Sequence, residues 1–318
     1  MHRRARLVAI LGVAAVLGIA CGSGDGANGN GGGGPGTGGN GDLDGAFVTT
    51  NSGDGGNNSN NNANCIAPVD MFIMFDRSGS MNEPQADDQG DCNIGQNVDS
   101  KWCKSINALS GYFKSQGANG QAAALQFFPL SNHSDNLCRT GTGYDVAALP
   151  PTGYAQLPTP LFDNALNNQT PGGINGSAGT PTEAAIRGLT KFTAANRRGG
   201  RVTIGILITD GDPNGCNERL SALSDLLAAH NKATQIRTYV IGMKGATFDN
   251  LEKIAAGGAA PPHADAVAGI TDACGNGGGP CRHWNVGDGD PKVFSAALAA
   301  IQESADGCKD GGGFVNPK

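Results

Sequence analysis

The stretch "MFIMFDRSGSM", residues 71–81, is apolar for five residues and then turns polar at Asp76. Ser78 and Ser80 follow at every second position, with Gly79 between them. An unbroken apolar run of this kind is typical of a strand that is buried on both faces of a parallel sheet. Gly79 permits a tight backbone where the strand ends. The stretch therefore predicts a central strand with an acid and two hydroxyls at its carboxyl end.

Strands and helices alternate after this stretch. Strand-like runs cover 69–75, 121–128, 201–209, 236–243 and 283–286, and a short edge strand is predicted at 145–149. Helical patterns cover 101–116, 160–168, 181–198, 217–230, 248–257 and 290–305. Trp102 and Phe113 lie on the apolar side of the helix at 101–116, so we assign them to the core. The order predicts an α/β fold, with a doubly wound, mainly parallel sheet flanked by helices.

The N-terminus has the pattern of an export signal. A basic start, "MHRRAR", precedes 14 apolar residues that end at Cys21. The apolar run is short for a membrane span. The order "LGIAC" is similar to a bacterial lipoprotein signal, which predicts a lipid on Cys21 after cleavage; an ordinary signal peptide cut near Ala20 is the alternative. We expect export, with the protein anchored to a bacterial membrane and facing the periplasm or the cell surface, or else secreted.

Composition then divides the remaining chain. Residues 22–64 hold 16 Gly and 10 Asn in 43 positions, and so few apolar groups do not offset the entropy of ordering the segment. We predict a signal segment at 1–21, a disordered tether at 22–64, a folded domain at 65–308 and a tail at 309–318. The tether would hold the domain clear of a membrane.

Charge and cysteine content limit the partners and the compartment. Without Arg3, Arg4 and Arg6 of the signal, 19 basic residues face 28 acidic ones, a balance of −9, which argues against nucleic acid and anionic lipid as partners. Removing Cys21 from nine cysteines leaves eight, an even number that suggests four disulfides in an oxidising compartment. Cys65 with Cys308 and Cys274 with Cys281 are our suggested pairs. The sequence contains no Cys-x-x-Cys motif, so the spacing of the cysteines does not indicate a zinc site.

Polar side chains gather where the central strands end. Asp76, Ser78 and Ser80 follow one buried strand, and Asp210 follows the most strand-like run, at 201–209. Thr180 lies just before the helix at 181–198. Ligands of such sheets bind outside the carboxyl ends of the strands, and carboxylate and hydroxyl oxygens suit Mg²⁺, Mn²⁺ or Ca²⁺. Because only two of the five groups are acids, a bound ion would stay electropositive and attract a carboxylate from a partner.

These residues resemble the metal-ion-dependent adhesion site of the von Willebrand factor type A (VWA) domain family. The match consists of Asp-x-Ser-x-Ser at Asp76, Ser78 and Ser80, Thr180 in "GTPT" and Asp210 in "TDG". The resemblance covers about residues 65–308 and implies a Rossmann-like fold. It implies that the two Ser bind metal directly, that Asp76 acts through water, and that a partner's Glu or Asp completes the shell. Bacterial exported members of the family look similar to this chain.

Simpler structural roles exist for the same residues. Asp76 and Ser78 suit a helix-capping turn, and Asp210 suits an Asp-Gly turn. In "TPTE", Thr180 and Glu183 fit a capping box, with Thr180 as N-cap. The acidic segment 82–99 is either a second calcium site or, as we favour, a solvated insertion. His133, His230, His263 and His283 lie in unrelated contexts, which disfavours a Ser–His nucleophile.

The sequence thus predicts a binding module rather than an enzyme. Its function would be divalent-metal-dependent capture of an acidic protein partner for adhesion or scaffolding. One alternative is a Mg²⁺-dependent phosphatase or hydrolase with Asp76 as nucleophile, although Ser78 stands where a second Asp is usual. Another is a structural domain that the metal only stabilises.

Overall fold

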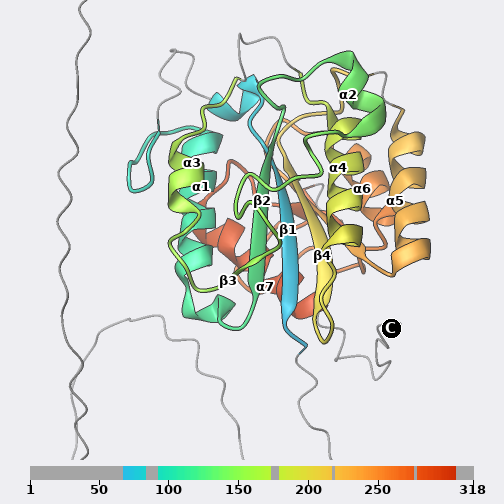
Figure 1. Cartoon of the computed structure of the whole chain (residues 1–318). Coiled ribbons are helices and arrows are strands. Elements are labelled where there is room, and N and C mark those ends of the chain that lie inside the picture. The colour runs from blue at the N-terminus through green and yellow to red at the C-terminus, as the bar shows by residue number, and fades with distance from the viewer. Residues whose placement is uncertain (1–66, 84–91, 173–178, 217–218, 276–277, 306–318) are drawn as a thin grey trace, which may run out of the picture. The chain divides into compact units, whose positions relative to one another are not determined.

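A six-stranded sheet forms the centre of the domain, with the strand order β3-β2-β1-β4-β5-β6 (Figure 1). The computed structural model describes residues 67–83, 92–172, 179–216, 219–275 and 278–305, all within one compact unit of the chain. The strands are β1 (Val69–Asp76), β2 (Ala122–Phe128), β3 (Ala155–Gln156), β4 (Val202–Thr209), β5 (Arg237–Gly242) and β6 (Trp284–Asn285). The predicted strand runs at 69–75, 121–128, 201–209, 236–243 and 283–286 are each confirmed to within a few residues.

The sheet is mainly parallel, as predicted. β1 pairs in parallel with β2 on one side and with β4 on the other. The pairs β4–β5 and β5–β6 are also parallel, and only β3 is antiparallel to its neighbour β2. Every residue of β1 is buried, which explains its uninterrupted apolar sequence. β1 therefore lies in the interior of the sheet, and its carboxyl end adjoins those of β2 and β4.

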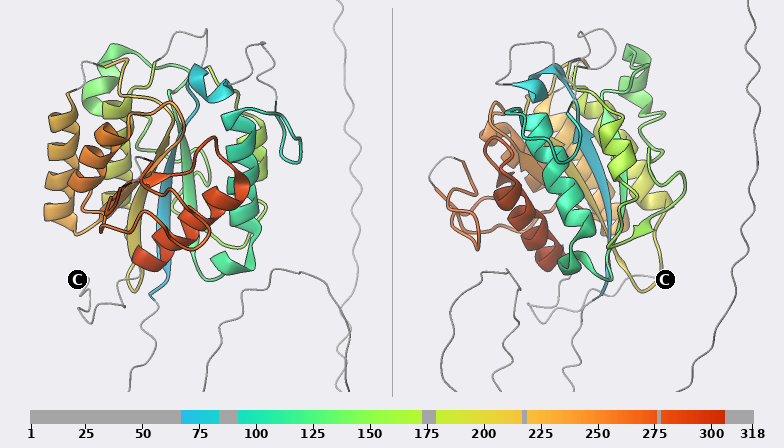
Figure 2. Two further views of the ribbon diagram at one scale, coloured as in Figure 1. Left: turned by 180° about the vertical axis from the view of Figure 1, so that it is seen from behind. Right: turned by 90° about the vertical axis from the view of Figure 1, so that its left-hand side faces the viewer.

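Helices cover both faces of the sheet. The α-helices are α1 (Lys101–Lys114), α2 (Asp135–Thr140), α3 (Asp163–Asn167), α4 (Thr182–Ala195), α5 (Leu220–Thr234), α6 (Phe248–Gly257) and α7 (Pro291–Ala305). The edge-on view of Figure 2 places α1 and α7, which contact each other, on one face and α4 on the other. α5 packs between α4 and α6. This two-sided covering is the doubly wound arrangement that the sequence predicted.

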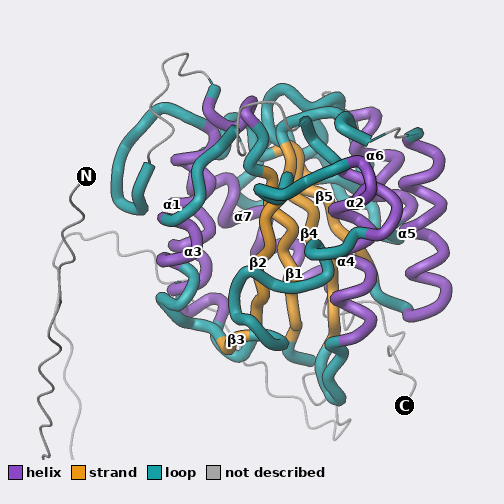
Figure 3. Tube along the Cα trace, turned by 45° about the horizontal axis from the view of Figure 1, so that its top comes forward, coloured by secondary structure: helices purple, strands orange, loops and turns teal. Residues whose placement is uncertain are grey.

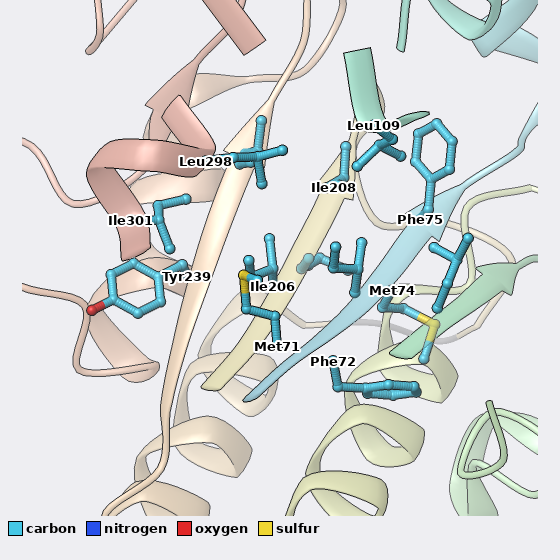
Figure 4. Close-up of a cluster of buried hydrophobic side chains, with 14 of the residues drawn as sticks. Met71, Phe72, Met74, Phe75, Leu109, Ile206, Ile208, Tyr239, Leu298 and Ile301 are labelled. Atoms are coloured by element: carbon cyan, nitrogen blue, oxygen red, sulfur yellow. The ribbon is translucent and has the colours of Figure 1, made fainter. Parts of the chain in front are cut away.

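The core consists of apolar side chains from the sheet and from the inner sides of the helices. Figure 4 shows Phe72 and Met74 of β1 directed to one side of the sheet, and Met71 to the other with Ile206 of β4. Trp102 and Phe113 of α1 are fully buried, which confirms their assignment to the core. Phe75 stacks on Trp102 at 5.0 Å between ring centroids. This packing fixes β1 against α1, and hence the carboxyl end of β1 against the start of that helix.

Two local predictions were wrong. The edge strand expected at 145–149 is a turn with a single bridge between Leu125 and Leu149. The edge strand is instead β3, at Ala155–Gln156, where two residues pair with Ala122 and Ala123. No helix was predicted in the segment between β2 and β3, but α2 forms there. α2 spans only six residues, too few for an amphipathic period to be recognised in the sequence.

Three disulfides join described residues. The predicted pair Cys274–Cys281 is present, with its sulfurs 2.05 Å apart. Cys138–Cys216 ties α2 to the segment that follows β4, and Cys92–Cys103 ties the segment before α1 to α1 itself. The suggested pair of Cys65 and Cys308 lies outside the described residues, as do Cys21 and the segments 1–21, 22–64 and 309–318. None of the helices in the described part of the chain is both long and apolar enough to cross a membrane.

Candidate metal centre

The predicted oxygen ligands meet where β1 and β4 end. Asp76 is the last residue of β1, and Asp210 directly follows the last residue of β4. Because the two strands are parallel neighbours, both acids emerge at the same edge of the sheet. Figure 3 tips this edge toward the viewer, and the loops that follow the strands converge over it. The sheet order alone therefore gathers groups that are more than a hundred residues apart.

Ser78, Ser80 and Asp210 form a tight cluster of oxygens. The Ser80 hydroxyl donates to Asp210 Oδ1 at 2.8 Å and lies 3.0 Å from Ser78 Oγ. Ser78 Oγ lies 3.5 Å from the same carboxylate oxygen. Ser80 belongs to a 3-10 helix, η1 (Gly79–Asn82), so the chain turns at Gly79 rather than continuing the alternation of an extended strand. The turn brings the two hydroxyls together under Asp210.

Asp76 lies beneath this cluster and is fully buried. Its Oδ1 accepts the backbone N–H of Ser78 at 2.7 Å, and its Oδ2 accepts the Thr209 hydroxyl at 2.6 Å. Burial, together with repulsion from Asp210, raises the pKa of Asp76 to about 7, although these two hydrogen bonds act to lower it. The site therefore holds two buried acids close together, an arrangement that a cation would relieve.

Thr180 lies beside the loop that carries Asp210. Its backbone N–H donates to Asn214 Oδ1 at 2.7 Å, and its carbonyl accepts the Asn214 N–H at 2.9 Å. A methyl group on Gly211, the residue after Asp210, would lie 3.0 Å from Thr180 Oγ1. Asn214 thus fastens Thr180 to the loop that carries Asp210, with the Thr180 hydroxyl directed at that loop.

The predicted capping box at Thr180 is wrong. α4 begins at Thr182, and its N-cap residue is Pro181, which makes no side-chain capping bond. Glu183 instead forms an ion pair with Arg187 one turn later, at 2.7 Å. The Thr180 backbone is bonded to Asn214 through both its N–H and its carbonyl, so Thr180 belongs to the loop before the helix.

A lysine also belongs to the site. Lys101, the first residue of α1, is only 3% exposed, and its Nζ lies 2.5 Å from Asp210 Oδ2. The same ammonium donates to the carbonyl of Lys244 at 2.9 Å and to Glu83 Oε2 at 3.4 Å. Asp210 therefore faces the two serines with one oxygen and a buried ammonium with the other.

Lys101, Thr209 and Asn214 belong to the site but were not predicted from the sequence. Thr209 had a signal, because it ends the strand that precedes Asp210 and its hydroxyl lies at the same edge of the sheet as Asp76. Asn214 follows a Pro and precedes a Gly, a composition that reads only as a turn. Lys101 had no signal, since a lysine at the start of an amphipathic helix is normally solvated.

The donor set fits a hard divalent cation. Two serine hydroxyls and one carboxylate oxygen lie within 3.5 Å of each other, and a second carboxylate lies just below. Such oxygen ligands suit Mg²⁺, Mn²⁺ and Ca²⁺ better than soft metals. In the described parts of 82–99, Glu83 and Asp99 pair with Lys101 and Lys104 rather than with each other. These contacts give no support to a second calcium site in that segment.

Two further groups bring a histidine close to two cysteines: His133 with Cys138 and Cys216, and His263 with Cys274 and Cys281. In both groups the two sulfurs are bonded to each other as disulfides. A metal needs free thiolates as ligands, so these cysteines are not available to zinc while the disulfides are intact.

A family model described as the von Willebrand factor type A domain matches residues 159–272. The matched range contains Thr180 and Asp210, while Asp76, Ser78 and Ser80 lie before it. A comparison with curated protein sequences finds no match.

Solved structures also resemble the chain. Proximal thread matrix protein 1 from the mussel byssus, with a zinc-occupied metal-ion-dependent adhesion motif, is 14% identical with a TM-score of 0.43, covering 76% of this chain and 49% of that one. The PilB minor pilin from Streptococcus sanguinis is 14% identical with a TM-score of 0.40, covering 78% of this chain and 63% of that one. The chain thus spans about half the length of the mussel protein.

Proposed function

We propose that this chain is a divalent-metal-dependent binding domain that captures an acidic residue of a protein partner. The observation that carries this proposal is the convergence of Ser78 Oγ, Ser80 Oγ and Asp210 Oδ1 from two separate strands. Three hard oxygens brought together beside a second buried acid are the kind of ligand set that a hard divalent cation prefers. The match to the VWA family model supports the same function.

The residues have distinct roles in this proposal. Ser78 and Ser80 would bind Mg²⁺, or Mn²⁺ or Ca²⁺, directly through their hydroxyls. Asp210 and Thr180 would contribute directly or through water, and Asp76 would act through water. Because the hydroxyl ligands are neutral, the ion keeps part of its charge and attracts a carboxylate from outside. A partner's Asp or Glu would therefore complete the coordination shell.

Asp76 is better suited to this supporting role than to nucleophilic attack. Both of its carboxylate oxygens already accept hydrogen bonds, and the residue is fully buried. A nucleophile has to reach its substrate with one oxygen. The observed contacts therefore favour binding over the hydrolase that the sequence left open.

Display from a membrane is the second part of the proposal. The export signal and the position of Cys21 favour a lipid anchor on that residue, followed by the Gly- and Asn-rich tether. We propose that a bacterial lipoprotein of this kind presents the metal site to partners in the periplasm or at the cell surface. Labelling of the expressed full chain with a fatty-acid analogue, compared with a Cys21→Ser variant, tests the anchor.

A capture experiment tests the binding function. The full chain is incubated with native cell envelope in Mg²⁺, in EDTA, and as the Asp76→Ala variant, and bound proteins are recovered. We expect a partner in Mg²⁺ only, with the far-UV circular dichroism unchanged in EDTA. Equal recovery under all three conditions would falsify the metal-bridged mechanism, and Mg²⁺-dependent phosphatase turnover that Asp76→Asn abolishes would replace it with the enzymatic one.

A further inference from the structure

Lys101 is placed against the usual preferences of its residue type. It is buried, and it opens α1, where the partial positive charge of the helix dipole disfavours a cation. Lysines are rarely buried unless they are paired. The pairing here is with Asp210 Oδ2 at 2.5 Å. The Asp210 carboxylate thus stabilises the buried ammonium of Lys101.

Three loops enclose the ammonium. Besides Asp210, its Nζ contacts the carbonyl of Lys244 and the carboxylate of Glu83. A methyl group on Gly245 would lie 3.3 Å from Nζ and 2.8 Å from the Asp210 carbonyl. The lysine is therefore held between the ends of β1, β4 and β5 by its surroundings. A mobile surface side chain would not be confined in this way.

The position of the Lys101 ammonium matters because of the acids around it. Asp76 and Asp210 are two buried acids that repel each other. Among the described residues, Lys101 is the cationic side chain that lies within ion-pair distance of these acids, at Asp210. The ammonium thus supplies part of the positive charge that a divalent ion would supply, and it does so from the opposite side of Asp210 to the serine hydroxyls.

We propose that Lys101 is a tethered counter-ion that competes with the divalent cation for the charge of Asp210, so that it stabilises the metal-free site and weakens metal binding. This inference rests on the proposed function of the site. Glu83 can pair with the Lys101 ammonium when a metal ion displaces it from Asp210. Glu83 Oε2 lies 3.4 Å from Nζ, and the Glu83 side chain is 67% exposed. Lys101 is therefore a positioning residue, which acts on the metal through Asp210.

Thermodynamic linkage gives the inference two readouts. If the ammonium and the metal oppose each other, removing the ammonium strengthens metal binding by the same factor by which the metal favours the variant. Lys101→Met should then bind Mn²⁺ about tenfold more tightly or better, since a unit charge a few ångströms away is weakly screened in a buried site. The same variant should melt lower than wild type without metal, and the difference should shrink when Mn²⁺ is added.

Lys104→Met is the matched control. Lys104 lies one turn along α1 and pairs with Asp99 and Asp288, not with Asp210. The Lys104→Met substitution removes the same charge from the same helix. The Mn²⁺ affinity of this variant should therefore remain within about twofold of wild type if the effect depends on contact with Asp210. Calorimetric Mn²⁺ titrations and thermal unfolding of the full chain, in EDTA and in Mn²⁺, provide both measurements.

Each outcome decides between the two proposals. Tighter binding by Lys101→Met alone supports the counter-ion, even if wild type binds too weakly to measure. Equal or weaker binding by Lys101→Met overturns the counter-ion and leaves the metal site standing. No binding by any of the three proteins overturns both proposals.

If Lys101→Met does not fold in EDTA, refolding in Mn²⁺ tests the same competition. Recovery of the fold in Mn²⁺ supports the inference, because the metal then replaces the ammonium. Lys101→Gln, which retains a donor for the Lys244 carbonyl, is the second variant. Failure of both variants to fold in Mn²⁺ makes Lys101 purely structural and overturns the inference.

Discussion

At the scale of single residues, Asp76 is distinguished by an acidic side chain that is fully buried. Its two hydrogen bonds fix the carboxylate, while burial and the neighbouring Asp210 disfavour its ionised form. In the metal-free protein this raises the pKa from 3.8 to about 7. The folded state therefore holds a proton between those pH values that the unfolded chain has released.

This difference predicts how stability depends on pH. A group with a raised folded pKa contributes stability below its unfolded pKa, and that contribution is lost as the pH rises through the folded value. The metal-free protein should lose up to about 4 kcal/mol between pH 4 and pH 7, at about 1.4 kcal/mol per pKa unit. Urea unfolding of metal-free protein at pH 5 and pH 8 measures the part of this loss that falls above pH 5, about 3 kcal/mol.

Asp76→Asn supplies the comparison, because the amide stays neutral over this range. Its free energy of unfolding should fall less than that of wild type between pH 5 and pH 8. Added Mg²⁺ should restore stability at pH 8 to wild type and not to the variant. Parallel pH profiles for the two proteins would mean that Asp76 does not titrate in this range.

Residue chemistry also explains which part of the site the sequence predicted. Asp76, Ser78, Ser80 and Asp210 stand where buried strands end, so the parallel sheet brings them together without further information. Lys101 and Asn214 enter through contacts between loops, and no local pattern encodes such contacts. The capping box was wrong at Thr180 because α4 begins at Thr182, with Pro181 as its N-cap residue.

At the scale of elements, the position of the loop before α4 depends on Gly179, which has no side chain. An alanine methyl at Gly179 would lie 1.7 Å from Asn214 Oδ1, the atom that accepts the Thr180 N–H. Gly179→Ala should therefore displace Asn214 and release Thr180 from the loop of Asp210. We expect a loss of about 1–3 kcal/mol in stability and weaker Mn²⁺ binding.

Gly199→Ala is the control for this variant, because a methyl group there has no neighbour within 4 Å. Its stability should change by no more than about 0.5 kcal/mol, and its Mn²⁺ affinity should not change. Thermal unfolding and Mn²⁺ titration of both variants give the answer. Unchanged metal affinity in Gly179→Ala would remove Thr180 from the site.

The disulfides differ in the length of chain that they close. Cys138–Cys216 spans 78 positions, whereas Cys274–Cys281 spans 7. In the chain-entropy treatment the longer loop stabilises by about 2 kcal/mol more than the shorter one. Replacing both cysteines of the long pair by serine should lower the melting temperature by about 4–8 °C more than replacing those of the short pair. Equal shifts would locate the effect in native packing rather than in the unfolded chain.

The elements that the sequence predicted are those with a strong period or a long apolar run. β1 and β4 are eight residues each and almost wholly buried, and the long helices are amphipathic. β3 has only two residues and exists because it pairs with β2, so its own sequence carries little signal. α2 is likewise short, and Cys138 within it is fixed by a distant partner.

At the scale of the whole domain, the two ends of β1 carry acids in opposite circumstances. At the amino end, Asp70 Oδ2 accepts Arg198 Nε at 2.7 Å, and its Oδ1 lies 2.5 Å from Arg201 Nε. Asp76 at the carboxyl end has no such guanidinium within ion-pair distance among the described residues. The two arginines thus neutralise Asp70 within the fold. Asp76 is neutralised by a proton or, in our proposal, by a bound cation.

This contrast predicts that stability and metal binding separate along the strand. Asp70→Asn removes the charge between two partly exposed arginines and should cost about 2–3 kcal/mol, below the range for fully buried pairs because solvent reaches the guanidinium groups. Six residues of strand place the two acids about 20 Å apart, a separation at which the interaction between their charges is weak. Mn²⁺ affinity should therefore stay within twofold of wild type in Asp70→Asn and be lost in Asp76→Ala. A loss of Mn²⁺ affinity in a folded Asp70→Asn protein would show instead that β1 transmits a change from one end to the other, and the metal site would then depend on the whole strand rather than on the loops at its end.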